Sequence, residues 1–73
     1  MNNVVWHKIS DFDFPQPYKD VLIYTSNGRY VIGYYSGESD VYPWYDYLTQ
    51  KTSKGKEYLY WCELPDYPKG VEN

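Results

Sequence analysis

The sequence predicts a mainly β fold: a small antiparallel sheet or open barrel of four to five strands, in one domain spanning the 73-residue chain. Two runs rich in β-branched and aromatic residues, 21–26 and 29–35, flank the dipeptide Asn27-Gly28, which is typical of a β-hairpin. A third such run covers residues 58–64. Because an isolated hairpin is marginal in water, we expect the remaining strands to pair with this central one.

The dipeptide Asn27-Gly28 favours a two-residue type I′ turn, since both residues tolerate the positive φ that this turn requires. With that turn, one face of the hairpin carries the facing pairs Val21 with Tyr34, Ile23 with Ile32, and Thr25 with Tyr30. The other face carries Leu22 with Gly33, Tyr24 with Val31, and Ser26 with Arg29. Both faces hold large apolar groups, so we expect the hairpin to lie inside the sheet with at least partial cover on each side.

Residues 4–9 alternate as a short strand with Trp6 as its anchor. Residues 10–19 contain two prolines within three positions, and proline lacks the N–H that a strand ladder needs. This stretch is therefore predicted to be an extended loop, attached to the core by Phe12 and Phe14.

Residues 41–48 are ambiguous between strand and helix. A strand is favoured, but Pro43 also suits the first position of a short helix around 43–50. The polar stretch 49–57 is predicted to be a loop, and the tail 66–73, with its prolines and glycine, is predicted to fray.

Aromatic rings are expected to supply the core. A single cysteine, Cys62, excludes an internal disulfide, and a single histidine, His7, leaves a zinc site short of ligands. Aromatic residues make up 22% of the chain, and each buried ring removes on the order of 150–250 Å² from water. We expect the three tryptophans and some tyrosines to be core, with Trp6 and Trp61 mostly buried against the hairpin. Gly33 leaves room for one of these two rings to lie on the sheet.

The formal charge of −3 and the pI near 4.8 disfavour direct nucleic-acid binding, because no basic field is present to hold a phosphate backbone. No apolar run approaches the roughly 18 residues of a membrane-spanning helix, and residues 1–4 do not resemble a secretory signal. With a free cysteine in addition, a cytoplasmic location is expected.

Twelve positions carry a resemblance to a known family: Trp6, Ile9, Pro15, Val21, Leu22, Gly33, Tyr34, Tyr35, Trp61, Leu64, Pro65 and Pro68. Their order, an N-terminal tryptophan, a proline loop, a Val-Leu strand, a Gly-Tyr-Tyr strand and a Trp-x-x-Leu-Pro ending, resembles small phage and bacterial proteins of the family called domain of unknown function 551. The resemblance covers nearly the whole chain, although residues 38–57 have no counterpart and the first loop is one residue longer. It implies a phage-associated context and no catalytic residues.

One stretch combines aromatic rings with acids that no Lys or Arg compensates between residues 36 and 48. The candidate binding residues in it are Glu38, Asp40, Tyr42, Trp44, Tyr45 and Tyr47. Tyr and Trp anchor interfaces at small cost in rotamer entropy, and carboxylates steer such a surface toward a basic partner. The alternative is that half of the rings belong to the core and that the acids only solvate the loop.

Three other features are weaker candidates. His7 with Asp11 or Asp13 has the composition of an acid–base pair, but no motif supplies a nucleophile. Cys62 lies in a predicted strand and is read as an inert apolar side chain. The lysines of the stretch 51–56 suit a phosphate contact, yet lysines on a loop are usually solvated.

The sequence therefore predicts no enzyme, no metal and no cofactor. We expect a non-enzymatic accessory binding protein of phage type, located in the cytoplasm of the host cell, that acts on a host protein, for instance as an inhibitor of a defence system. The alternative is a protein that binds a small ligand, a nucleotide or a sugar, against Tyr and Trp faces. A homo-oligomer is compatible with either reading.

Overall fold

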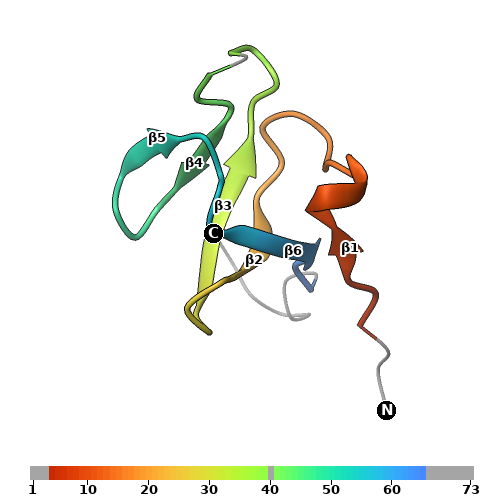
Figure 1. Cartoon of the computed structure of the whole chain (residues 1–73). Coiled ribbons are helices and arrows are strands. Elements are labelled where there is room, and N and C mark those ends of the chain that lie inside the picture. Colours follow the sequence, from red (N-terminus) through yellow and green to blue (C-terminus); the bar gives the residue numbers. More distant parts are fainter. Residues whose placement is uncertain (1–3, 40, 66–73) are drawn as a thin grey trace, which may run out of the picture.

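The computed structural model describes residues 4–39 and 41–65, which form one antiparallel sheet of six strands in the order β1-β6-β2-β3-β4-β5 (Figure 1). The strands are β1 (His7–Lys8), β2 (Val21–Thr25), β3 (Tyr30–Tyr35), β4 (Trp44–Asp46), β5 (Lys51–Ser53) and β6 (Tyr58–Glu63). A short 3-10 helix, η1 (Ile9–Asp11), follows β1. The predicted mainly β fold is confirmed, and the hairpin β2–β3 lies at the centre of the sheet.

The sheet is open but strongly curved, and in Figure 1 the strand β6 runs across the direction of β2 and β3. Two strands separate β4 from β6 in the sheet order, yet the rings of Trp44 and Tyr58 lie 5.4 Å apart between centroids. We call the face on which they meet the inner face. The core consists of residues on this face: Val21, Ile23, Val31, Trp44, Tyr58 and Trp61.

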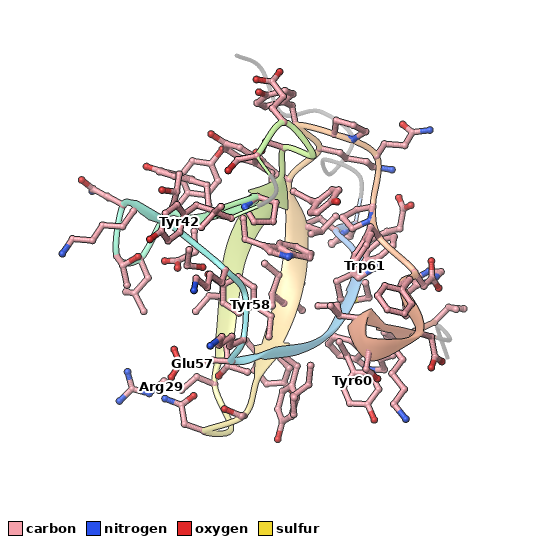
Figure 2. All side chains as sticks on the ribbon, turned by 45° about the horizontal axis from the view of Figure 1, so that its top comes forward. Arg29, Tyr42, Glu57, Tyr58, Tyr60 and Trp61 are labelled. Carbon is pink, nitrogen blue, oxygen red and sulfur yellow. The ribbon has the colours of Figure 1, made fainter. Side chains whose placement is uncertain are left out.

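A β-bulge places Tyr58 on the inner face. Tyr24 faces Tyr60 and the next residue, Thr25, faces Tyr58, so Leu59 is an extra residue on β6. Without that extra residue, Tyr58 and Tyr60 would point to the same side of the strand, because side chains alternate. Instead Tyr58 lies inside the curve of the sheet and Tyr60 outside it (Figure 2).

The turn of the hairpin differs from the predicted one. The N–H of Gly28 donates to the Thr25 carbonyl at 3.0 Å, and the N–H of Thr25 donates to the Arg29 carbonyl at 2.8 Å, which gives a three-residue loop. Gly28 has φ +79°, whereas Asn27 does not have the positive φ that a type I′ turn requires. The Thr25 hydroxyl bonds the Asn27 side chain and the Arg29 backbone, and these bonds stabilise the longer loop.

The predicted register of the hairpin is consequently wrong by one residue. Val21 faces Gly33, and Ile23 faces Val31. A shift of one residue moves every side chain of β3 to the other face, so Val31 is buried and Ile32 is exposed. The inner face is covered and the opposite, outer face is covered in part, in agreement with the expected partial cover on each side.

The N-terminal strand is shorter than predicted, and Trp6 does not belong to the core. Trp6 keeps 39% of its surface exposed and contacts Tyr24 and Tyr30 on the outer face. The place beside Trp61 on the inner face is taken by His7, whose ring stacks on the indole at 4.1 Å. Alternation then directs Trp6 to the outer side. Trp61 itself is 5% exposed, as predicted.

Of the two phenylalanines predicted to attach the loop after η1 to the core, Phe14 does so and Phe12 does not. The Phe14 ring stacks on Tyr35 at 4.7 Å and meets Trp44 edge-on. Phe12, the other predicted attachment, has φ +60° and points into solvent.

The stretch after residue 41 forms the favoured strand, β4, and not the alternative helix around 43–50. Asp46 ends the strand, because its carboxylate accepts from the N–H and hydroxyl of Thr49 and its carbonyl accepts from Gln50. That turn reverses the chain and lets β5 pair with β4 inside the predicted loop 49–57. The predicted frayed tail, 66–73, lies outside the described residues.

Gly33 does not leave a slot for a tryptophan ring, as the sequence suggested. A Cβ at this position would lie 2.1 Å from the carbonyl oxygen of Tyr45 and 2.9 Å from Cα of Asp46. Glycine is needed here because the backbone of β4 occupies the space that a side chain would fill.

Candidate functional site

Four tyrosines form one cluster on the outer face, and we call it the tyrosine surface: Tyr18, Tyr34, Tyr45 and Tyr47. Tyr34 and Tyr45 face each other across β3 and β4, and their rings stack at 5.1 Å between centroids. Tyr18 lies 5.4 Å from Tyr34, and Tyr47 lies 5.3 Å from Tyr45. The two central rings are half-buried, whereas the two outer rings are exposed.

Backbone hydrogen bonds position the two outer rings. The N–H of Tyr18 donates to the Tyr35 carbonyl at 2.8 Å, which holds the loop before β2 against the end of β3. The N–H of Tyr47 donates to the Ile32 carbonyl at 2.9 Å, which continues the pairing of β4 with β3 by one residue beyond Asp46. These bonds fix the backbone from which the two rings project, and the rings themselves contact Tyr34 and Tyr45.

Two carboxylates lie at the rim of the tyrosine surface. The hydroxyl of Tyr47 donates to Asp20 Oδ1 at 2.7 Å, and this hydrogen bond is the main cause that raises the pKa of Tyr47 to about 12. A hydrogen bond to Glu38 likewise raises the pKa of Tyr18. Both hydroxyls thus remain protonated donors at neutral pH.

The rim charges are not compensated by ion pairs. Within residues 4–39 and 41–65 the two ion pairs join His7 with Asp13 and Lys19 with Glu63, so neither involves Asp20 or Glu38. The tyrosine surface therefore consists of four rings held in fixed positions and two carboxylates available to a cation.

Half of the predicted binding residues belong to this surface, namely Glu38, Tyr45 and Tyr47. Trp44 is wrong as a binding residue, although it belongs to the core as expected of the tryptophans: it is 2% exposed, because alternation along β4 turns it inward and turns Tyr45 outward. Tyr42 is exposed but forms no ring pair with another described residue, and Figure 2 shows it on the far side of the molecule from Tyr60. Asp40 lies outside the described residues.

Sequence reasoning missed three members of the surface: Tyr18, Asp20 and Tyr34. Tyr34 would have been found from the correct hairpin register, which puts it on the outer face opposite Tyr45. Tyr18 carries no comparable signal, since its place depends on a backbone conformation with φ +64° in a proline-rich loop.

A buried pair of polar side chains, Tyr58 and Asp46, lies on the inner face. The Tyr58 hydroxyl donates to Asp46 Oδ2 at 2.6 Å, and Thr49 donates to Oδ1 through its N–H at 2.7 Å and its hydroxyl at 3.0 Å. Burial acts to raise the pKa of Asp46, but these hydrogen bonds outweigh it and lower the pKa. Burial, followed by the bond to Asp46, raises the pKa of Tyr58 to about 12.

We expect Tyr58→Phe to lower the free energy of unfolding at pH 7 by about 1.5–3 kcal/mol, because it removes a hydrogen bond to a buried charged group. The pKa of Tyr58 rises from 10.0 to about 12 on folding, so its proton stabilises the fold fully below pH 10. That contribution is lost as the pH rises towards 12. Urea denaturation between pH 7 and pH 11.5 measures it, and the exposed Tyr42→Phe is the control. An equally steep alkaline loss in Tyr58→Phe and wild type would contradict the assignment.

Two of the weaker candidates from the sequence, His7 and Cys62, have structural roles. Asp13, and not Asp11, is the partner of His7: its Oδ2 lies 2.7 Å from Nδ1, and its carbonyl accepts from Trp61 Nε1 at 2.6 Å. These contacts hold the first loop against β6. Burial, with a smaller effect of Glu63, raises the pKa of the Cys62 thiol, which disfavours the reactive thiolate.

The three lysines of the stretch 51–56 line one cavity of about 350 Å³ between β5 and β6. Asp46 and Glu57 line the same cavity, so its charge is mixed.

No family model, no curated protein and no solved structure matches the chain. The resemblance to domain of unknown function 551 stays a prediction. In the part of the chain that the structure describes, no helix is long and apolar enough to span a membrane. Among the same residues, no three or more His, Cys, Asp or Glu side chains come together as a metal site.

Proposed function

We propose that the chain is a non-enzymatic protein-binding domain and that its tyrosine surface binds a basic surface of its partner. The observation that supports this proposal is the exposed tyrosine cluster rimmed by Asp20 and Glu38, neither of which has a cationic partner among the described residues. Tyrosine rings and carboxylates together suit arginine and lysine side chains, through cation–π contacts and charge.

The fixed positions of the rings favour binding further. Tyr47 is held by its backbone bond to Ile32 and by its hydroxyl bond to Asp20. A side chain that is already ordered loses little conformational entropy when a partner covers it. The surface therefore needs no rearrangement to dock.

The phage context implied by the resemblance leads us to propose a host protein as the partner, with a component of a defence system as the expected class and the host cytoplasm as the place. Affinity capture from a bacterial lysate, followed by mass spectrometry, tests this. The informative proteins are those retained by the wild type and by Tyr42→Ala but lost with Tyr47→Ala. Tyr42 and Tyr47 are matched in exposure, at 51% and 46%.

We expect Tyr47→Ala to weaken binding of a captured partner by about 2 kcal/mol, or roughly 30-fold, with the melting temperature near that of the wild type. Asp20→Asn and Glu38→Gln remove charge but leave an amide oxygen to accept from the tyrosines. These two changes should mainly slow association and flatten its dependence on salt, as surface plasmon resonance would measure. Unchanged affinity in Tyr47→Ala together with unchanged association rates in the charge variants would refute the proposed surface.

A further inference from the structure

A second aromatic group lies on the outer face, away from the tyrosine surface. Trp6, Tyr24, Tyr30 and Tyr60 line a cleft of about 270 Å³, which we call the aromatic cleft. They come from the segment before β1 and from β2, β3 and β6. The bulge at Leu59 contributes to this cleft, because it separates Tyr60 from the inward-facing Tyr58.

The walls of the aromatic cleft are tilted rings. Tyr24 makes an angle of 66° with Trp6 and 57° with Tyr30, at centroid distances of 6.4 and 5.3 Å. Trp6 and Tyr30 lie closer to parallel, at 27° and 6.2 Å. The result is a V-shaped groove and not a slot between two parallel faces.

The polar groups of the cleft are hydrogen-bond donors of neutral side chains. The indole N–H of Trp6 and the three phenol hydroxyls make no hydrogen bond to another described side chain or backbone group. No carboxylate lines the cleft. The residue that faces Tyr60 across β1 and β6 is a cation, Lys8.

We propose that the aromatic cleft binds a proline-rich peptide segment in the polyproline II conformation. Such a segment offers pyrrolidine rings that pack between tilted aromatic rings, and its backbone carbonyls are free to accept from indole and phenol donors. The polyproline II helix is also formed before binding, so little conformational entropy is lost. This site does not rest on the tyrosine surface, with which it shares no residue.

Two other ligands fit the cleft less well. A quaternary ammonium or methylated lysine is attracted to aromatic rings, but here no carboxylate lines the cleft to complement it, and the residue that faces Tyr60 across the sheet is the cation Lys8. A nucleotide base stacks best between parallel faces, and of the ring pairs in the cleft only Trp6 and Tyr30 come near to parallel, at 27°. Both kinds of ligand are therefore tested beside the peptide.

Tryptophan fluorescence of the full chain reads out binding directly. Trp44 and Trp61 are 2% and 5% exposed, so Trp6 is the tryptophan that a ligand in the cleft contacts. The probe is a decaproline peptide with blocked ends, and a glycine-serine peptide of equal length is the control. We expect a saturable change with decaproline, no change with the control peptide, and loss of the signal in Trp6→Phe.

Variants then locate the site by calorimetry, which does not need Trp6. Tyr30 is 61% exposed, so Tyr30→Ala should fold as the wild type does and weaken decaproline binding at least 10-fold. Tyr60→Phe keeps the ring, removes one donor, and should weaken binding several-fold. Tyr47→Ala and Tyr42→Ala should bind decaproline as the wild type does.

The proposal is overturned if decaproline does not bind at millimolar concentration, or if it binds equally to the wild type, Tyr30→Ala and Tyr60→Phe. It is also overturned if tetramethylammonium or adenosine monophosphate gives a saturable Trp6 response and decaproline gives none. The proposed tyrosine surface would remain unaffected by these results, because its own test uses Tyr47→Ala.

Discussion

Trp44→Ala is expected to lower the free energy of unfolding by about 3–5 kcal/mol, which approaches the whole stability of a domain this small. The Trp44 ring meets Tyr35 at 5.1 Å and Tyr58 at 5.4 Å, and so joins β4 to β3 and β6. The chain also passes directly over the ring: a Cβ at Gly55 would lie 2.4 Å from its Cδ1 atom. Removing the indole leaves a cavity that these strands cannot close without moving.

Urea denaturation followed by circular dichroism measures this loss. Trp6→Ala is the matched control, since it deletes the same side chain from a position that is 39% exposed, and it should cost clearly less. Equal losses in the two variants, or a smaller loss in Trp44→Ala, would mean that Trp44 is not at the centre of the core.

Gly33→Ala is the second substitution from which we expect a large effect: it should lower the free energy of unfolding by about 3 kcal/mol or more. The added Cβ would lie 2.1 Å from the Tyr45 carbonyl oxygen, and that atom belongs to the main chain and has no other rotamer. Strand β4 would have to move away from β3, which would also separate the stacked rings of Tyr34 and Tyr45.

Thermal melting and amide hydrogen exchange in β4 report this displacement. Gly37→Ala is the control: there the new Cβ meets only the Tyr35 side chain, at 3.3 Å, and the strain comes from φ +69°. We expect Gly37→Ala to lower the free energy of unfolding by about 1 kcal/mol. If the Gly33→Ala protein had the melting temperature of the wild type and unchanged amide hydrogen exchange in β4, the two strands would not need this close approach.

The sequence locates the hairpin but not its register. Alternating β-branched and aromatic residues around Asn27-Gly28 are enough to predict a turn. The choice between a two-residue and a three-residue loop depends on the Thr25 hydroxyl, which bonds Asn27 and Arg29. Such a contact is visible only in three dimensions, and it decides which face every residue of β3 occupies.

The candidate site was predicted in part for the same reason. Tyr45 and Tyr47 follow from the density of rings and acids in their stretch, but that density does not distinguish Trp44, which points inward. Alternation separates such neighbours only after one residue has been assigned to a face. Tyr60 shows the limit of that rule, because the bulge at Leu59 breaks the alternation within a single strand.

The place of β6 in the sheet has a consequence for how the chain folds during synthesis. This strand pairs with β1 on one side and β2 on the other, although both precede it in the sequence by more than thirty residues. A nascent chain that stops before residue 58 lacks the strand that joins the first two and exposes Trp44 and the rest of the inner face. Such unfinished chains expose aromatic surface of the kind that chaperones and proteases recognise. The native sheet is complete only when the place between β1 and β2 is filled by a segment that is made late.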